Sequence, residues 1–394
     1  MKRFISNVLI LGVCLTPLTV PVMVQPSWGQ SQNSQSEKIL KLLLQAEEQE
    51  NKGKPLQAIE TLQQLLAIAR QLKDKKLEAT ALVWLGRKYY ESSQNESALN
   101  YYNQALSIFR AERDRSAEAA ALTNIGVVYL TIGKTQQGLD YFNQALSIQR
   151  EKGDRAAQAS ILTNIGAFYR ATGQPQQGLD YFKQTLLIFR EERDRSGEAS
   201  VLLSIGAVYD DIGESQKALD YYNQALTIFR ELRNLSGIAR TLNNIASVYH
   251  SIGEPLKALD YYNQALPTFI QITDRFGQAA TLNNIGGIYK DLGQLQKALD
   301  YYKQALPIFR EINVRSGEAA TLNNLGETYS KMGQHKQALE FYNQALPITR
   351  EVSNRSGEAA ILINIGGVYQ ATGQPQKALD YYSQALPICR SSRG

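Results

Sequence analysis

Apolar residues recur along most of this chain at the spacing of one helix face. In residues 277–316, Leu282, Ile285, Ile288 and Tyr289 follow one another at intervals of three or one, which is typical of one side of an α-helix. After Gly293 a second helical pattern runs through Ala298, Leu299, Tyr302, Ala305, Leu306, Phe309 and Ile312. The segment therefore predicts two helices joined by a short turn.

The turn between the two predicted helices has its own chemistry. In four places it reads Gly-x-Pro, at Gly53, Gly173, Gly253 and Gly373. Glycine suits the left-handed conformation that ends a helix, and proline suits the first turn of the next helix. We therefore expect each segment to form a helical hairpin.

The hairpin pattern repeats every forty residues without an insertion. Nine units follow from residue 37: a degenerate first unit, 37–76, and then 77–116, 117–156, 157–196, 197–236, 237–276, 277–316, 317–356 and 357–394. A fixed period of this size predicts a single array of stacked, near-identical units.

The order of key residues in each unit resembles the tetratricopeptide repeat signature. In one unit it is Leu282, Ile285, Gly286, Tyr289, Gly293, Ala298, Tyr302 and Ala305. The forty-residue period is similar to the subclass found in kinesin light chain and in Leu-Gly-Asn repeat scaffolds. The resemblance implies an all-α, right-handed superhelical solenoid of helix-turn-helix hairpins that acts as a non-catalytic protein-binding scaffold.

Two features depart from, or add to, that signature. The proline that normally ends the second helix is absent, and prolines stand earlier instead, at Pro267, Pro307, Pro347 and Pro387, where we expect them to bend the helix. Glycine recurs inside the first helix, where it costs about 1 kcal/mol relative to alanine. We expect these glycines to face small residues of the second helix, such as Ala218 and Ala298, so that the two backbones approach closely.

The first 29 residues differ from the array. Lys2 and Arg3 precede an apolar run, and Ser27 and Gly29 are small residues at the two positions that determine cleavage. Residues 1–29 are therefore predicted to be a signal peptide. A retained membrane anchor is the alternative, and Pro17 and Pro21 disfavour it. Residues 30–36 are expected to form a polar, unstructured spacer. The protein is therefore predicted to be exported, periplasmic or extracellular, with no membrane span after cleavage.

Charge and cysteine content narrow the function classes. The net charge is +5, and it falls to +3 once Lys2 and Arg3 are removed. The charges are interspersed, without the basic stripe that a nucleic-acid binder shows, so no nucleic-acid partner is expected. Cys14 lies in the predicted signal peptide and Cys389 stands alone, so stability is expected to depend on stacking.

Candidate chemistry for catalysis is sparse. His250 and His335 occupy different positions in their units, and the adjacent Asp210 and Asp211 point in different directions on a helix. No phosphate-binding loop or nucleophile motif occurs. We therefore expect no enzyme activity, no metal site and no cofactor.

Asparagine forms the informative column. One asparagine recurs just before the Ile/Leu-Gly pair, and a second precedes it in three units, giving Asn124, Asn164, Asn243, Asn244, Asn283, Asn284, Asn323, Asn324 and Asn364. Asparagine is an indifferent helix former, so propensity does not explain the column. Families with forty-residue repeats hold the backbone of an extended peptide with such a ladder, and the resemblance implies a protein or peptide ligand here. The alternative is that the asparagines bond to a neighbouring helix and tie repeats together.

The array also predicts a second class of function. Residues 378–390 form an ordinary internal second helix, with no capping helix expected after it. An apolar face around Ala378, Tyr382 and Leu386 would then be open to association. Self-assembly, as a homodimer through residues 378–390, is the alternative to peptide binding.

Overall fold

The computed structural model describes residues 30–51 and 54–391, and the predicted signal peptide lies outside them. The chain divides into two compact units between Asp194 and Arg195. We call the described residues up to Asp194 the N-terminal unit, and those from Arg195 the C-terminal unit. The boundary falls between two repeats of the predicted array.

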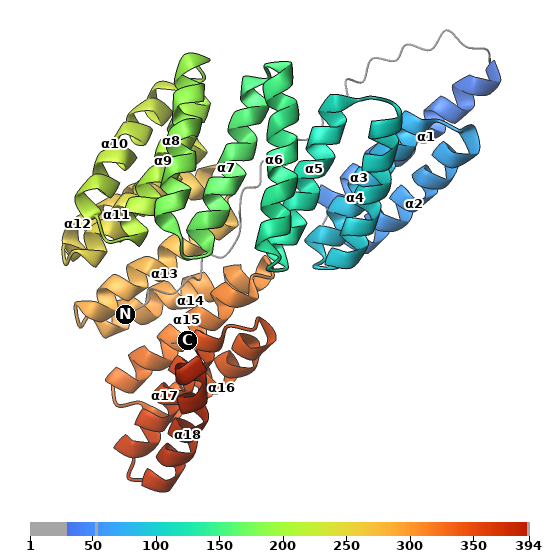
Figure 1. Cartoon of the computed structure of the whole chain (residues 1–394). Helices are drawn as coiled ribbons and strands as arrows, with labels where there is room; N and C mark the ends of the chain where they lie inside the picture. Colours follow the sequence, from blue (N-terminus) through green and yellow to red (C-terminus); the bar gives the residue numbers. More distant parts are fainter. Residues whose placement is uncertain (1–29, 52–53, 392–394) are drawn as a thin grey trace. The chain divides into compact units, whose positions relative to one another are not determined.

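The N-terminal unit consists of helices packed in antiparallel pairs (Figure 1). Its helices are α1 (Gln30–Asn51), α2 (Pro55–Leu72), α3 (Lys75–Glu91), α4 (Asn95–Ala111), α5 (Arg115–Thr131), α6 (Thr135–Lys152), α7 (Arg155–Ala171) and α8 (Pro175–Glu191). Because α1 begins at Gln30, the expectation that residues 30–36 lack regular structure was wrong. Polar residues there extend the first helix instead of preceding it.

The C-terminal unit repeats the same hairpin five times. Its helices are α9 (Arg195–Asp211), α10 (Ser215–Glu231), α11 (Leu235–Ser251), α12 (Pro255–Gln271), α13 (Arg275–Asp291), α14 (Leu295–Glu311), α15 (Arg315–Lys331), α16 (His335–Glu351), α17 (Arg355–Ala371) and α18 (Pro375–Ser391). The described residues contain helices and turns and no strand, so the fold is all-α, a solenoid of stacked helical hairpins.

The helix ends follow the local sequence. Gly253 has a φ of 82° between α11 and α12, and Pro255 is the first residue of α12, as the Gly-x-Pro pattern predicted. At the start of α13, the side chain of Asp274 accepts a hydrogen bond from the backbone N–H of Gly277 at 2.8 Å. This N-cap bond satisfies one of the free N–H groups of the first turn.

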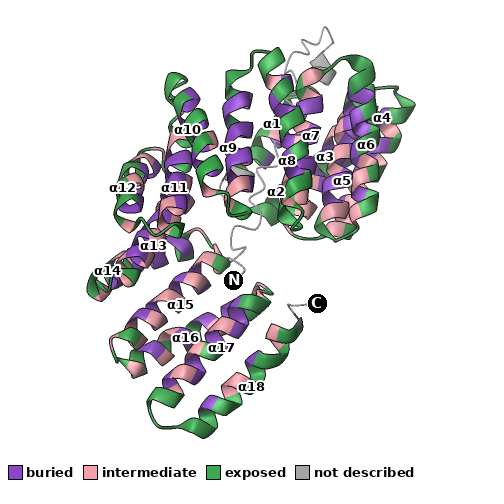
Figure 2. Ribbon diagram, turned by 60° about the vertical axis from the view of Figure 1, so that its left-hand side comes forward, coloured by how far each residue is buried: buried purple, intermediate pink, exposed green. Residues whose placement is uncertain are grey.

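Each hairpin from α3–α4 to α15–α16 closes over one buried aromatic ring. In the second helices, Tyr222, Tyr262, Tyr302 and Tyr342 are at most 1% exposed. The preceding tyrosine lies half-buried at the edge and stacks on a tyrosine of the first helix, as Tyr301 does on Tyr289 with ring centroids 5.4 Å apart. Figure 2 shows the buried positions concentrated on the sides of the helices that face each other.

The glycines of the first helices make room mainly for this ring. A Cβ atom added at Gly286 would lie 2.7 Å from a ring carbon of Tyr302, closer than real Cβ contacts allow. The expected approach of backbone to backbone holds at Gly126 and Gly166, where an added Cβ would lie 3.0 and 3.1 Å from the carbonyl oxygens of Gly138 and Gly178. Elsewhere the expectation was incomplete, because the aromatic ring occupies the space beside the glycine.

The prolines inside the second helices do not end them. Helices α12, α14, α16 and α18 continue on both sides of Pro267, Pro307, Pro347 and Pro387.

No helix in the described part of the chain is long and apolar enough to cross a membrane.

Candidate functional site

The first helices of the C-terminal unit form a continuous surface. Helix α11 contacts both α9 and α13, and α15 contacts both α13 and α17, so first helices of successive repeats lie next to one another. We call the solvent-facing side of α11, α13, α15 and α17 the first-helix face. It carries the paired asparagines and the side chains one turn after them.

Hydrogen bonds join the asparagines from one repeat to the next. The Oδ1 atom of Asn283 on α13 accepts bonds from Thr321 Oγ1 at 3.2 Å and from Asn324 Nδ2 at 3.1 Å, both on α15. Both donors lie one repeat further along the chain. Asn283 therefore links two consecutive hairpins through side chains alone.

The same arrangement recurs on either side. Thr281 Oγ1 donates to Asn243 Oδ1 at 3.1 Å, and Asn364 Nδ2 donates to Asn323 Oδ1 at 3.1 Å. The asparagines of α11, α13, α15 and α17 are all half-buried, so part of each amide remains open to solvent. The predicted inter-repeat bonds are present in this unit, and contact with a ligand stays a prediction for the exposed part.

Glu327 is a hub of this network. Its carboxylate accepts from Lys290 Nζ at 2.5 Å, from Asn323 Nδ2 at 2.9 Å and from Asn364 Nδ2 at 3.3 Å. Burial opposes ionisation of Glu327, but the charge of Lys290 and the three hydrogen bonds hold its pKa below the ordinary value. The half-buried charge is therefore paired, and its hydrogen bonds join α13, α15 and α17.

A second layer of hydroxyl groups lies under the first-helix face. Tyr262 of α12 is almost fully buried, and its hydroxyl lies near the side chains of Ser247 and Asn284. Burial raises the pKa of Tyr262, so the phenol stays protonated at physiological pH.

The asparagines of the first helices are bonded differently in the N-terminal unit. Asn124 on α5 is half-buried, and Asn164 on α7 is 7% exposed with an Nδ2 atom that has no hydrogen-bond partner. Among the described residues of this unit, no hydrogen bond ties either side chain to the next repeat. At the corresponding position α3 carries Trp84. The network that joins successive repeats is therefore a feature of the C-terminal unit.

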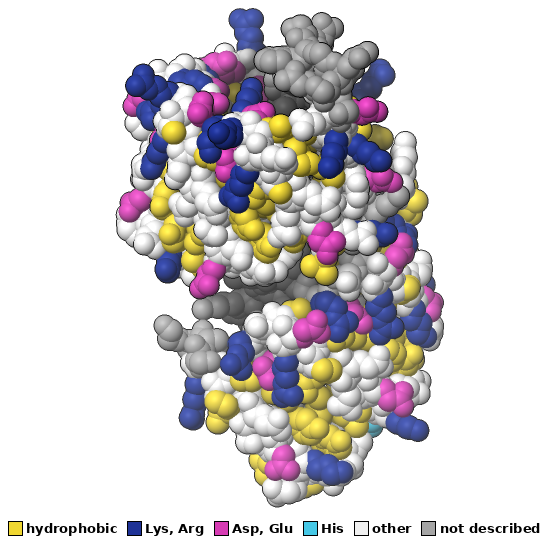
Figure 3. All heavy atoms as spheres, turned by 90° about the vertical axis from the view of Figure 1, so that its right-hand side faces the viewer, with side chains coloured by type: hydrophobic (Ala, Val, Ile, Leu, Met, Phe, Trp, Pro, Cys, Tyr) yellow, Lys and Arg dark blue, Asp and Glu magenta, His cyan; other side chains and the backbone are white. Residues whose placement is uncertain are grey.

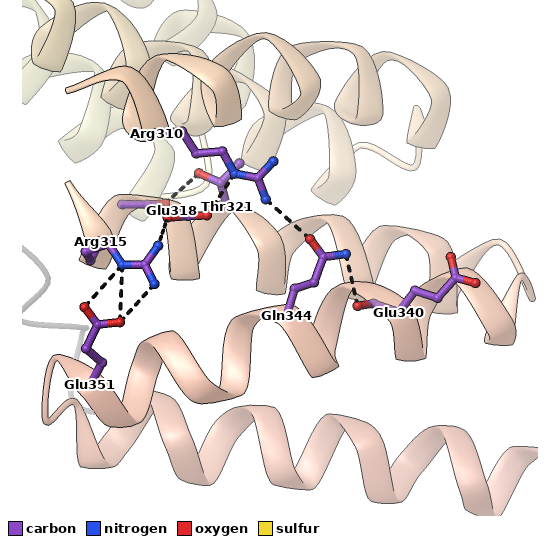
Figure 4. Close-up of polar contacts among 8 residues, drawn as sticks. Arg310, Arg315, Glu318, Thr321, Glu340, Gln344 and Glu351 are labelled. Atoms are coloured by element: carbon purple, nitrogen blue, oxygen red, sulfur yellow. Dashed lines mark hydrogen bonds and ion pairs between the residues drawn. The ribbon is translucent and has the colours of Figure 1, made fainter. Parts of the chain in front are cut away.

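A second set of ion pairs lies at the turns between repeats. Glu318 is 5% exposed and accepts from Arg310 Nε at 2.8 Å and Arg315 Nη1 at 2.5 Å (Figure 4). Arg315 also reaches Glu351 of the next second helix at 2.9 Å. Equivalent pairs recur at Glu118 and Glu358.

Charge and metal-ligating chemistry give no further site. Acidic and basic side chains are interspersed on the face shown in Figure 3. Within residues 30–51 and 54–391, no group of three or more His, Cys, Asp or Glu side chains could hold a metal ion. His250 pairs instead with Asp291 of the next repeat, Nε2 to Oδ2 at 3.0 Å.

The repeat geometry agrees with comparison to known families. Models described as tetratricopeptide repeat match residues 48–111, 157–231, 237–311 and 317–391, and a further one matches residues 119–152. These matches cover well over half of the chain. The chain belongs to the tetratricopeptide repeat family. Comparison with curated proteins gives no match.

Solved tetratricopeptide repeat structures share this fold at low sequence identity. The chain is similar to the apo form of the quorum sensor NprR from B. thuringiensis, with 16% identity, a TM-score of 0.61, and coverage of 91% of this chain and 100% of that one. It is also similar to aspartyl phosphate phosphatase F from Bacillus subtilis, with 16% identity, a TM-score of 0.58, and coverage of 92% and 96%. A third similar structure is a Rap protein complexed with competence and sporulation factor, with 16% identity, a TM-score of 0.58, and coverage of 90% and 98%.

Several residues of the network were missed by sequence reasoning. No role was predicted from the sequence for Thr281 and Thr321, or for Glu327 and Lys290. One signal was present: threonine recurs two residues before the paired asparagines in three units, at Thr241, Thr281 and Thr321. A side chain that recurs with the asparagines is a candidate hydrogen-bond partner for them.

Proposed function

We propose that this protein is a non-catalytic protein-interaction scaffold that binds an extended peptide or protein segment along the first-helix face. The observation that carries the proposal is the run of seven half-buried asparagines on α11, α13, α15 and α17, which are partly open to solvent and of which five are fixed by hydrogen bonds. A side chain that is already oriented loses less conformational entropy when a ligand binds.

The internal bonds leave complementary atoms for a peptide backbone. An amide has two N–H donors and a carbonyl acceptor. Asn283 uses its Oδ1 internally, so its Nδ2 atom is left to donate to a ligand carbonyl. Asn324 uses an N–H of its Nδ2 internally, so its Oδ1 is left to accept from a ligand N–H. Such a row binds main-chain groups without selecting side chains.

Two of the structural relatives support this class of function. The Rap structure contains competence and sporulation factor, and NprR is described as a quorum sensor. The likeness of this chain to both concerns the fold, so the ligand of this chain is inferred from its own residues.

The test is selection of short random peptides on the full-length chain, followed by affinity measurement with two triple variants. Alanine at Asn244, Asn284 and Asn324 is expected to weaken binding of the selected peptides at least tenfold, because each lost hydrogen bond costs about 1 kcal/mol. Helicity measured by circular dichroism should persist.

A matched control is available on the second helices. Asn223, Asn263 and Asn343 are exposed asparagines on α10, α12 and α16, and their alanine triple variant should bind peptide as the parent does. Equal loss in both variants would contradict binding at the first-helix face. Unfolding of the first variant alone would assign the asparagines a structural role only.

We also propose that the protein is exported, on the strength of the charged start and apolar run in residues 1–29. Fractionation of cells that express the full-length chain should place a shortened product outside the cytoplasm. A product of full length in the membrane fraction would favour the retained anchor.

Self-association is a second candidate function, favoured by exposure on α18. Leu379 and Leu386 are 59% and 49% exposed, whereas their equivalents on α14, Leu299 and Leu306, are 2% and 9% exposed. Burying these leucines against a second copy would remove apolar surface from water. Light scattering should then show a dimer that Leu379→Glu with Leu386→Glu converts to a monomer, and a monomeric parent at high concentration would overturn the idea.

A further inference from the structure

The hairpin of α17 and α18 presents an apolar surface on the side where each earlier hairpin of its unit contacts the next one. On α18, Leu379 and Leu386 are 59% and 49% exposed, and Tyr382 is half-buried, whereas its equivalent Tyr342 is 1% exposed. On α17, Ile363 is 45% exposed. We call Ile363, Leu379, Tyr382 and Leu386 the C-terminal end face.

Ile363 restricts what can cover this face. It stands where α11, α13 and α15 carry asparagines whose Oδ1 atoms accept hydrogen bonds from the following repeat, at Asn243, Asn283 and Asn323. Isoleucine cannot accept such a bond. An apolar side chain at this position is buried where another first helix covers it, since Leu203 on α9, which contacts α11, is 9% exposed. The C-terminal end face therefore requires an apolar surface as its cover.

Helix α1 does not offer such a surface. On α13, Ile285 and Ile288 are 0% exposed and pack in one cluster with Tyr262 of the preceding hairpin. The equivalent residues of α1 are Gln45 and Glu48, and both are exposed. Stacking α1 of a second copy on the C-terminal end face would press these polar groups against leucine, which costs free energy. Head-to-tail growth of the array is therefore unfavourable.

The same face of a second copy provides the apolar cover that α1 lacks. A two-fold axis sets one patch against the identical patch of the partner copy. If the axis crosses α18 near its middle, the N-terminal half of each helix lies beside the C-terminal half of the other. The exposed Asp380 of one copy then lies toward the exposed Arg390 of the other, so the charges at the rim are complementary.

Arg390 has the chemistry of an inter-repeat contact. Its equivalent Arg350 donates to Glu358 of the following repeat at 2.7 Å. No acidic side chain in the described part of the chain pairs with Arg390. A carboxylate of a second copy would supply the missing partner.

We propose that two copies of this chain join through their C-terminal end faces about a two-fold axis, and that the assembly stops at the dimer. Leu379 of each copy packs against Leu386 of the other, and Ile363 extends the contact onto α17. This inference rests on the proposed self-association and adds to it the symmetry of the contact and a limit on its growth.

Sedimentation of the full-length chain over a range of concentrations tests the limit on growth. The mass should rise from that of one chain to that of two and then stay constant. Masses that continue to grow would overturn the closed dimer and leave self-association intact. A monomer at every concentration would overturn self-association and this inference with it.

The variant Ile363→Asn tests the face without adding a charge. Asparagine occupies the equivalent position in α11, α13 and α15, so the variant should fold, as circular dichroism can verify. The dissociation constant of the dimer should rise at least tenfold, because two buried isoleucine side chains are lost. Leu256→Asn is the matched control, since Leu256 is 69% exposed on α12, outside this face, and it should leave the constant unchanged. Equal constants for the two variants would overturn the assigned face.

A charge exchange at Ser383 tests the two-fold axis. Ser383 is exposed on α18, between Leu379 and Leu386 in the sequence. Ser383→Lys and Ser383→Glu each place like charges across the axis, so each variant alone should dimerise more weakly than the parent. An equimolar mixture pairs opposite charges and should dimerise at least threefold more tightly than either variant. A head-to-tail contact sets Ser383 against a different part of the second copy, so a mixture without recovery would overturn the two-fold arrangement.

Discussion

Asn364 donates a hydrogen bond from Nδ2 to Oδ1 of Asn323, 3.1 Å away and one whole repeat earlier in the chain. Such a bond acts as a tie between hairpins that are otherwise joined by apolar contacts. In stacked repeats, stability is approximately the sum of the intrinsic stability of each repeat and the interface terms between neighbours. Side chains that bond across an interface therefore affect how cooperatively the array unfolds.

Asn283 should be costly to remove from this network. Because its Oδ1 atom accepts two inter-repeat bonds, Asn283→Ala is expected to lower the free energy of unfolding by about 1–2 kcal/mol. Asn263→Ala, at an exposed position of α12, should change it by less than about 0.5 kcal/mol. Urea denaturation followed by circular dichroism measures the unfolding free energy of both variants. Equal changes in the two variants would show that the inter-repeat bonds of Asn283 add no stability.

The helical pattern predicted much of this fold, and particular residues show why. The apolar pattern placed Tyr302 on the packed side of the second helix, and the structure confirms that it is buried, while the adjacent Tyr301 lies half-buried. The helix starts were less accurate. The unit was counted from Gly277, whereas α13 begins at Arg275 because Asp274 caps it.

The partners of the asparagines could not be predicted in the same way. Thr281 and Asn243 lie 38 residues apart, and their contact depends on how one repeat rotates against the next. A helical wheel gives the direction in which a side chain leaves its helix but not the group that it meets. The same wheel position therefore allows a bond to a ligand, to a neighbouring helix, or to both.

The adjacent glycines Gly286 and Gly287 should respond oppositely to alanine. Gly286→Ala places a methyl group 2.7 Å from the ring of Tyr302 and is expected to destabilise the protein by about 1–3 kcal/mol. Gly287→Ala meets no close atom, so its better helix propensity should stabilise the protein by up to about 1 kcal/mol. Thermal unfolding of both variants checks the pair. Ala246 stands at the position of Gly286 one repeat earlier, so the packing can adjust to a methyl group there, and the destabilisation should lie towards the lower end of this range. A Gly286→Ala variant as stable as the parent would contradict the packing described.

The arginine–glutamate ion pairs at the turns between repeats should make a small, salt-dependent contribution to stability. Glu118 is 7% exposed between Arg110 and Arg115, and although burial opposes its ionisation, their hydrogen bonds and charges lower its pKa. Because the two arginines are about half exposed, Glu118→Gln is expected to cost only about 0.5–1 kcal/mol. The cost should shrink in high salt, whereas the exposed control Glu112→Gln should show no cost at any salt concentration. A loss independent of salt would indicate hydrogen bonding in place of charge.

The half-buried ion pair of Glu327 and Lys290 should make the C-terminal unit sensitive to acid. The folded-state pKa of Glu327 lies below its value in the unfolded chain, near 4.5, so the carboxylate stabilises the fold above that pH. The stabilisation should be lost progressively as the pH falls through the folded-state pKa, when both states bind the proton. Glu327→Gln keeps the shape and one carbonyl acceptor but cannot titrate, so the difference in unfolding free energy between parent and variant should narrow from pH 6 to pH 3. Leaving Lys290 without its partner should cost about 1–3 kcal/mol at pH 6. Urea titrations at a series of pH values measure this difference, and one that stays constant down to pH 3 would show that the charge of Glu327 does not support the fold.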